Sequence, residues 1–274
     1  MRIVLHAGFH KTGTTSLQSA LAAHRAALSP QWVVQTAALS RPLGRVGKAA
    51  LAASADPATL GELRTALALW VAGLRPGPGR LISCEDMVGH MPGRHGVQDY
   101  AAACRLLPEV VQALTTRLPG AVVEVLLTTR AGPDWLRSIH WQLSKHPEMQ
   151  LSARGFARRY AGAADPGPVV QALGPLLAPA RLHVVPLKVL APRRLGPVEA
   201  VYDLAGLPDA LRARLPPVPR VDRSTPLDLA DTFARLNRAG LDPEELDRMK
   251  HEMVTLARLL VEEKPPLSSG PSMD

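Results

Sequence analysis

Four apolar runs rich in β-branched residues alternate with helix-like stretches over the first 190 residues, and this alternation most constrains the fold. The runs are RIVLHAG (2–8), RLISCE (80–85), AVVEVLLTTR (121–130) and RLHVVPLKVL (181–190). Near-continuous hydrophobicity is typical of strands buried on both faces, as in a parallel sheet. The helix-like stretches cover residues 16–28, 57–74, 108–118 and 133–145. The pattern predicts an α/β fold with an open, mainly parallel sheet flanked by helices.

The chain after residue 190 has a different character, with helices and a proline-rich stretch but no further strand pattern. Its segments are a short helix at 196–207, a proline-rich connection at 214–226, and two C-terminal helices at 227–239 and 243–263. No linker is long enough to separate two independent domains. We therefore predict a single domain over residues 1–264 with a helical C-terminal part, and a disordered tail at 265–274.

Charge and composition exclude several classes of protein. Lys and Arg number 32 against 24 Asp and Glu, a net charge of +8, which suits either an anionic ligand or a generally basic surface. The basic residues are scattered and not interleaved with aromatics, so we expect no nucleic-acid partner. The longest apolar segment, residues 66–74, is far shorter than the roughly 18–20 residues of a membrane span. The first apolar run is short and interrupted by His6, His10 and Lys11, so we do not expect it to be a signal peptide. Cys84 and Cys104 form no CxxC motif, so we expect reduced thiols in a cytoplasmic protein.

The stretch HAGFHKTGTTSLQ, residues 6–18, lies where the first strand would turn into the first helix. The first amides of a helix have no intrahelical partner, and the helix dipole adds partial positive charge there. Gly13 allows close backbone approach, Lys11 adds a full charge, and Thr14, Thr15 and Ser16 add hydroxyl donors. The turn therefore favours an anion-binding site. The alternative is a capped helix start, with Thr14 or Thr15 as the N-cap.

The spacing of Gly8 and Gly13 is that of the ATP-binding loop GxxxxGK[ST], but Thr14 stands where its lysine belongs and Lys11 lies inside the loop. KTGTTSLQ after a first strand closely resembles the phosphosulfate-binding loop of the sulfotransferases that use 3′-phosphoadenosine 5′-phosphosulfate (PAPS), particularly bacterial members with the form PHKTGTTSLQ. The resemblance implies a P-loop-like, three-layer sulfotransferase fold. It also implies a set of donor-binding residues in this loop, namely His10, Lys11, Thr12, Gly13, Thr14, Thr15 and Ser16.

A second motif strengthens the resemblance. The family binds the 3′-phosphate of PAPS with an arginine that ends a central strand and a serine eight residues later. Here the run VLLTTR ends at Arg130, and Ser138 follows eight residues on, after Pro133 at a helix start. Arginine can donate two hydrogen bonds to one phosphate, and a serine can add a third. The alternative is a structural Arg130 paired with Asp134.

The resemblance also implies the chemistry, which is transfer of a sulfuryl group from PAPS to a hydroxyl or amine of a carbohydrate or small-molecule acceptor, leaving the nucleotide PAP. Lys11 would offset charge on the leaving oxygen, without a metal ion. Glu85, at the end of the run RLISCE, is the predicted general base, although Glu85 or Asp86 could instead cap the next segment. The reserve candidates for the base are His10, His90 and His140.

The segment VDRSTP, with Arg223 and Ser224, resembles the C-terminal Asn-Arg-Ser of some bacterial sulfotransferases and would fold back over the nucleotide. It could equally be a helix-capping connection. Trp135 and Trp141 fit packing better than substrate binding.

Two rival functions remain open from the sequence. The first is a P-loop kinase or NTPase that uses Mg-ATP, with Asp86 as the magnesium-binding carboxylate. The second is a non-catalytic nucleotide-binding relative that keeps the fold without turnover.

Overall fold

The computed structural model describes residues 1–218 and 228–262. Its described residues form two compact units. The first comprises residues 1–139 and 159–218, and the second comprises residues 140–158 and 228–262.

The first unit is built on a five-stranded, all-parallel sheet in the order β2-β3-β1-β4-β5. The strands are β1 (Arg2–His6), β2 (Trp32–Thr36), β3 (Gly79–Ser83), β4 (Val122–Thr129) and β5 (Arg181–Pro186). The predicted α/β class with an open parallel sheet is therefore confirmed. Because β1 is central, the turn that follows it lies between the ends of β3 and β4.

Two features of the sheet differ from the sequence prediction. The strand β2 has no counterpart among the predicted runs, because WVVQT is short and has only two adjacent valines. The last predicted run continues to residue 190, but β5 ends at Pro186 and helix α8 (Leu187–Leu190) follows. Proline has no N–H to donate to a strand ladder, so the strand stops there.

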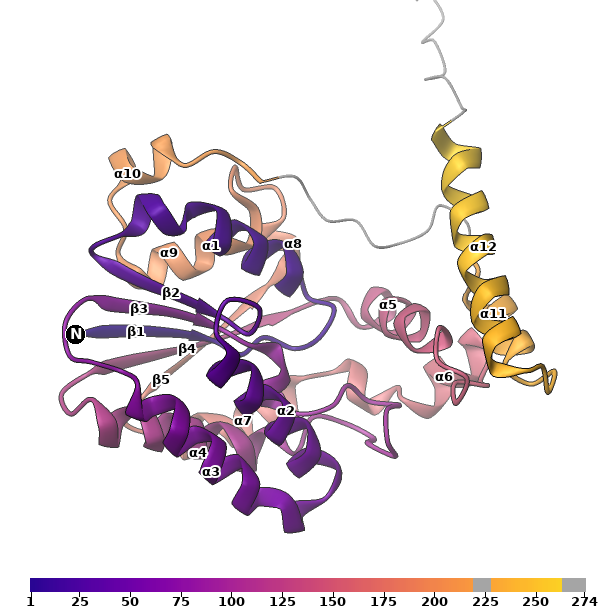
Figure 1. Cartoon of the computed structure of the whole chain (residues 1–274), viewed down its shortest axis with the longest axis horizontal. Helices are drawn as coiled ribbons and strands as arrows, with labels where there is room; N and C mark the ends of the chain where they lie inside the picture. Colours follow the sequence, from indigo (N-terminus) through magenta and orange to yellow (C-terminus); the bar gives the residue numbers. More distant parts are fainter. Residues whose placement is uncertain (219–227, 263–274) are drawn as a thin grey trace, which may run out of the picture. The chain divides into compact units, whose positions relative to one another are not determined.

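Helices cover both faces of the sheet (Figure 1). On one face lie α1 (Thr14–Leu28) and α9 (Glu199–Ala205), with η4 (Gly196–Val198), α8 and α10 (Asp209–Arg214) beside them. On the other face lie α2 (Arg41–Ala55), η1 (Pro57–Thr59), α3 (Leu60–Ala72), α4 (Ala103–Arg117) and α7 (Gly167–Leu176). The shorter elements η2 (Glu85–Val88) and η3 (Gly162–Ala164) lie in connections.

The helix α2 was not predicted, because two glycines and a proline in RPLGRVGKAALAASA lower its helix propensity. Packing overrides that weakness. Leu43, Val46 and Ala50 are fully buried along one face, and Ser40 caps the helix by accepting a hydrogen bond from the Leu43 amide.

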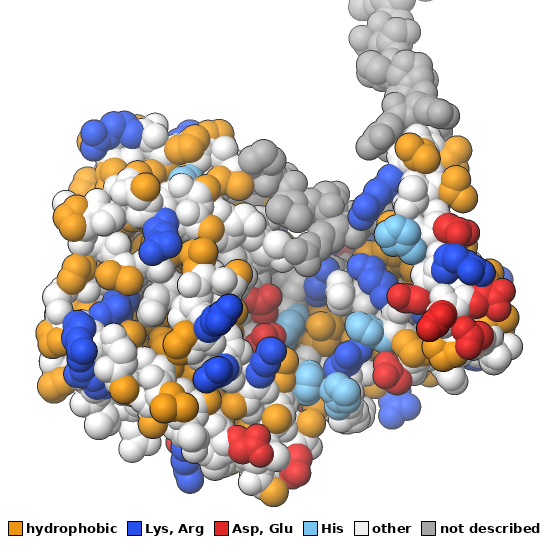
Figure 2. Space-filling view, viewed as in Figure 1, with side chains coloured by type: hydrophobic (Ala, Val, Ile, Leu, Met, Phe, Trp, Pro, Cys, Tyr) orange, Lys and Arg blue, Asp and Glu red, His pale blue; other side chains and the backbone are white. Residues whose placement is uncertain are grey.

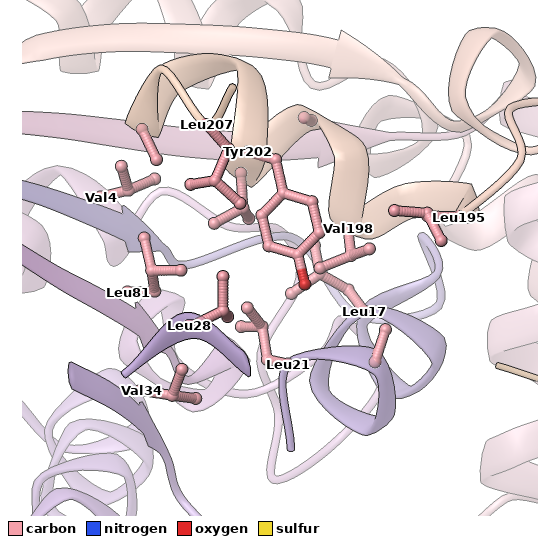
Figure 3. Packing of buried hydrophobic residues seen from close by; sticks show 14 of the residues in the cluster. Val4, Leu17, Leu21, Leu28, Val34, Leu81, Leu195, Val198, Tyr202 and Leu207 are labelled. Atoms are coloured by element: carbon pink, nitrogen blue, oxygen red, sulfur yellow. The ribbon is translucent and has the colours of Figure 1, made fainter. Parts of the chain in front are cut away.

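The core on the α1 side joins the helix to the sheet and to α9 (Figure 3). Leu17 and Leu21 of α1 are fully buried with Val4 of β1 and Leu81 of β3, and Tyr202 of α9 completes the cluster. The helix that begins at the predicted anion site is therefore fixed to the central strands by apolar burial.

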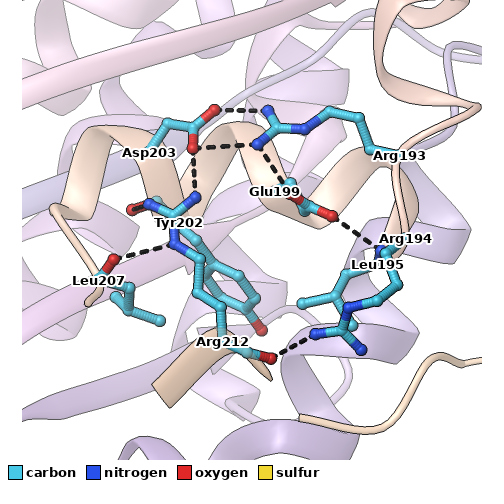
Figure 4. A network of polar contacts seen from close by, with 8 residues as sticks. All are labelled: Arg193, Arg194, Leu195, Glu199, Tyr202, Asp203, Leu207 and Arg212. Atoms are coloured by element: carbon cyan, nitrogen blue, oxygen red, sulfur yellow. Dashed lines mark hydrogen bonds and ion pairs between the residues drawn. The ribbon is translucent and has the colours of Figure 1, made fainter. Parts of the chain in front are cut away.

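A network of ion pairs links the residues after α8 to α9 and α10 (Figure 4). Asp203 accepts hydrogen bonds from Arg193 and Arg212, and Arg193 also pairs with Glu199 at 2.7 Å. The guanidinium groups hold the pKa of Asp203 below its usual value. The network fixes the segment between α8 and α10.

The second unit contains the end of α5 (Gly132–Ser144), α6 (Ala153–Arg159), α11 (Ala230–Leu236) and α12 (Pro243–Glu262). Trp141 packs against Phe233 in a tilted arrangement, with ring centroids 5.5 Å apart. The buried Asn237 side chain donates hydrogen bonds to the carbonyls of Ser144, His146 and Met149, which caps the end of α5. The predicted helical C-terminal part is thus present. Among the described helices, none has the length and apolar character that a bilayer crossing requires.

Candidate functional site

The turn between β1 and α1 leaves the carboxyl edge of the sheet, where open α/β sheets bind ligands. Gly13 precedes α1 with φ 94°, and a Cβ there would lie 2.7 Å from a methyl carbon of Leu187. The first helical hydrogen bond runs from the Leu17 amide to the Gly13 carbonyl at 3.1 Å. The amides of Thr14, Thr15 and Ser16 precede it and stay available to a ligand.

Thr14 is the most informative residue of this turn. Only 4% of it is exposed, and its hydroxyl has no hydrogen-bond partner among the described residues. An unsatisfied buried hydroxyl costs about 1–3 kcal/mol. Thr14 makes no capping bond, because the N-cap position belongs to Gly13 and has no side-chain cap. The hydroxyl therefore remains able to donate a hydrogen bond.

Lys11 lies in the same turn and adopts φ 67°, in the left-handed region that non-glycine residues rarely occupy. Such strain costs about 1–3 kcal/mol and clusters at ligand-binding sites. Thr15 and Ser16, like Lys11, are half-buried. The turn therefore combines backbone strain, one buried unpaired hydroxyl and three available amides.

A buried chain of hydrogen-bonded side chains connects the turn to β1, β3 and β4. Ser83 is 2.8 Å from Nδ1 of His6, and Nε2 of His6 is 3.3 Å from the Thr128 hydroxyl. Thr128 is 2.7 Å from the Thr12 hydroxyl, which donates to the Phe9 carbonyl at 2.5 Å. Burial lowers the pKa of His6 to about 3, so its ring is neutral. With the proton on Nε2, Ser83 donates to His6, His6 to Thr128, Thr128 to Thr12, and Thr12 to the Phe9 carbonyl.

Sequence analysis did not identify His6, Ser83 or Thr128, although each is a polar residue at the end of an otherwise apolar strand. Thr12 was predicted to bind the donor. Thr12 is 1% exposed, and its hydroxyl takes part in the hydrogen bonds that shape the loop.

His10 is held by three side chains. The Tyr100 hydroxyl lies 3.2 Å from the His10 amide and 3.1 Å from its Nδ1, while the Trp135 indole donates to the His10 carbonyl at 3.0 Å. Nε2 of His10 lies 3.5 Å from Asp86. These contacts fix the residue that precedes Lys11. Trp135 is 4% exposed and Trp141 8%, so both are packed side chains.

Glu85 follows β3, the strand beside β1, and is half-buried. Its Oε2 accepts a hydrogen bond of 2.5 Å from the Gln18 side chain of α1. Neither Glu85 nor Asp86 makes a side-chain cap on η2. The predicted base is thus oriented by the helix that begins at the predicted anion-binding turn.

Arg130 follows β4, the other neighbour of β1, and is half-buried. Among the described residues it has no ion pair, because Asp134 pairs with Arg137 at 2.5 Å instead. Ser138 is half-buried on α5, eight residues further on. A small pocket, with room for about one water molecule, places Arg130 near Phe9 and Thr12 of the turn, and its polar and aromatic lining comprises Phe9, Thr12, Tyr100, Thr129, Arg130 and Trp135.

The remaining predicted residues differ in how far the structure describes them. Arg223 and Ser224 are outside the described residues. His140 belongs to the second unit, where its Nε2 lies 2.8 Å from the Leu151 carbonyl. His90 lies in the first unit, with its ring centroid 4.6 Å from that of His95. Within the described part of the chain no group of three His, Cys, Asp or Glu residues is arranged to hold a metal ion.

Charged side chains are spread widely over the face shown in Figure 2. Lys and Arg lie singly or in small groups, with hydrophobic and acidic side chains between them. The excess of positive charge is therefore not gathered there into one stripe.

The chain was compared with protein families, curated proteins and solved structures. No protein-family model matches the chain, and no curated protein matches it. The chain is similar to a sulfotransferase from Alicyclobacillus acidocaldarius, with 12% sequence identity, a TM-score of 0.43, and 96% of each chain covered.

Proposed function

We propose that this protein transfers a sulfuryl group from PAPS to a hydroxyl or amine of a carbohydrate or small-molecule acceptor. The observation that carries the proposal is the buried, unpartnered hydroxyl of Thr14. It lies in a turn that also offers three helix amides and the charge of Lys11. A sulfate or phosphate group would satisfy these donors together.

Arg130 supports a donor with a second anionic group. It follows the strand adjacent to β1 and lines a small pocket together with Phe9 and Thr12 of the turn, yet it has no ion pair among the described residues. A half-buried guanidinium suits a phosphate because it can donate two parallel hydrogen bonds. PAPS carries a phosphosulfate at one end and a 3′-phosphate at the other, so the two positions match its charges.

The side chains of the site have distinct roles in this proposal. PAPS supplies the sulfuryl group when bound. Lys11 and the amides of Thr14 and Thr15 hold its 5′ side, and Lys11 offsets negative charge on the leaving oxygen. Glu85 accepts the proton of the acceptor, and the amide of Gln18 fixes the orientation of that carboxylate.

Nucleotide binding tests the first half of the proposal. We expect PAP to raise the melting temperature without magnesium, since a ligand at 100 times its Kd stabilises by about 2.7 kcal/mol. Arg130→Ala should weaken PAP binding at least tenfold. Arg137→Ala is the matched control, because Arg137 is exposed and pairs only with Asp134 among the described residues. Equal effects of the two substitutions would contradict the assignment of Arg130.

Turnover tests the second half. Labelled PAPS with a mixed pool of carbohydrates and small hydroxyl compounds should give labelled products. Loss of a charge-assisted bond of about 1.5–3 kcal/mol predicts at least tenfold slower transfer for Lys11→Ala. Glu85→Gln should slow transfer while keeping PAP binding, whereas Lys48→Ala on the exposed side of α2 should change neither. Unchanged transfer in Lys11→Ala and Glu85→Gln would favour a non-catalytic relative.

One observation favours the rival Mg-ATP enzyme. Asp86 lies just beyond the carboxyl end of β3, beside the turn, where such enzymes place a magnesium-binding carboxylate. Melting curves decide between the two functions. Stabilisation by Mg-ATP with none by PAP would overturn the sulfotransferase proposal.

A further inference from the structure

The loop 89–97, GHMPGRHGV, begins four residues after the proposed base Glu85 and is tightly turned. Gly93 donates a 2.8 Å hydrogen bond to the Val97 carbonyl, and the Val97 amide donates one of 3.0 Å to the Arg94 carbonyl. The His90 amide donates to the Ser54 hydroxyl at 2.9 Å, which anchors the start of the loop to α2. The loop therefore holds its side chains in a defined arrangement.

Two imidazole rings lie close together in this loop, tilted relative to each other. The ring centroids of His90 and His95 are 4.6 Å apart, with an angle of 55° between the planes. His90 is half-buried, whereas His95 is exposed, so the pair is open to solvent on one side. No role in donor binding or in proton transfer requires this pair.

The groups around His90 are mostly positive. Burial is the largest cause that lowers the pKa of His90 to about 4, and His95, Arg94 and His10 lower it further. Asp86 is the carboxylate that acts in the opposite direction. If His90 is protonated, its positive charge is repelled by Arg94 and by any charge on His95 and His10, and it is attracted by Asp86. A bound anion would offset that repulsion.

We propose that His90 and His95 bind an oxyanion of the acceptor, either a carboxylate or a sulfate ester. The acceptor class is then an anionic sugar-like hydroxyl compound, and this statement about the acceptor rests on the proposed function. In the proposed function, the turn binds the phosphosulfate of PAPS and Arg130 binds its 3′-phosphate. The imidazole pair instead follows Glu85 and Asp86 on the same connection and lies within electrostatic range of His10 and Asp86.

Proton NMR of the histidine Cε1–H groups tests anion binding directly. The wild-type protein, with and without PAP, is titrated with glucuronate, glucose 6-sulfate and neutral glucose at matched ionic strength. We expect a saturable shift of the His90 and His95 signals with at least one of the two anions and none with glucose. The pKa of His90 should rise by at least one unit in the complex, so binding should tighten as the pH falls from 7 to 5. Which anion binds more tightly identifies the carboxylate or the sulfate ester as the recognised group.

Variants separate a specific site from general charge effects. His90→Gln and His95→Gln should each weaken anion binding at least tenfold, while His251→Gln, at an exposed position on α12, should leave it unchanged. No saturable shift with either anion, equal shifts with glucose, or full binding in both loop variants would overturn the inference. The wild-type titrations decide even where a variant fails to fold.

The same samples distinguish this inference from the proposed function. A melting shift with PAP but no response to the sugar anions would overturn the anion site alone. Binding of the sugar anions without a PAP response would overturn the donor assignment and leave the anion site standing.

Discussion

Thr14 links stability to function at the scale of a single residue. Its hydroxyl is buried without a partner among the described residues, so it costs folding free energy in the unliganded protein. The same hydroxyl is a donor for the proposed phosphosulfate. Buried polar groups in folded proteins usually have a partner, and a bound ligand or an ordered water would supply one here.

Thr14→Val therefore has opposite expected effects on stability and on binding. Replacing the unpaired hydroxyl with a methyl group should raise the free energy of unfolding by about 1 kcal/mol or more, measured by urea denaturation. PAP affinity, measured by calorimetry, should fall. Thr65→Val is the matched control, because the Thr65 hydroxyl is satisfied by the Gly61 carbonyl on an exposed helix. A destabilised Thr14→Val with normal PAP affinity would contradict the assignment.

At the scale of elements, the buried chain through His6 ties three adjacent strands to one turn. Ser83 ends β3, His6 ends β1, and Thr128 lies near the end of β4. Parallel strands bring these positions to one edge of the sheet, which is why residues far apart in sequence form one chain of hydrogen bonds. The chain requires a neutral His6.

This requirement predicts acid sensitivity. The pKa of His6 is lowered by burial to about 3, so below pH 6.5 the unfolded chain binds a proton that the folded protein does not. Stability is then complete above pH 6.5 and falls below it, by up to about 1.4 kcal/mol per pH unit for this one group. His24 and His90, whose pKa values are also lowered, act in the same direction.

Urea unfolding at several pH values between 7 and 5 measures this slope, above the range in which carboxylates titrate. His6→Gln should flatten it, whereas His251→Gln should not. Stability that is constant over this range in the wild type would contradict a neutral, buried His6.

At the scale of the whole molecule, the helix that begins at the proposed anion site depends on the burial of its apolar side chains. Leu21 of α1 is fully buried against the sheet and α9, while Leu69 on α3 is 64% exposed. Leu21→Ala should lower the free energy of unfolding by about 2–5 kcal/mol, and Leu69→Ala by less than about 0.5 kcal/mol. Chemical denaturation checks both. PAP affinity of folded Leu21→Ala should stay within a few-fold of wild type, and a large loss would mean that the core itself shapes the site.

The alternation of apolar runs and helical stretches determined the α/β class, because strands buried on both faces need near-continuous hydrophobicity whatever their neighbours are. The same pattern also predicted the strand, turn and helix start that carry Lys11 and Thr14, because glycine and hydroxyl residues favour a turn and a helix N-terminus whatever their distant neighbours are. It did not predict β2 or α2, whose propensities are weak and which form because tertiary packing buries Val34, Leu43 and Val46. The single-domain arrangement and the roles of the site residues, including Lys11, Thr14, Glu85, Arg130, Ser138, Arg223 and Ser224, stay predictions.

Only the tertiary structure decided which side chains meet. The strand order placed Arg130 beside the turn, brought Gln18 to Glu85, and joined Ser83, His6 and Thr128 beneath the loop. It also decided that Asp134 pairs with Arg137 and that Thr14 is buried without a partner in the described chain. Sequence spacing carries backbone preferences over a few residues. Hydrogen bonds and burial depend on distances through space, which the packing of the sheet fixes.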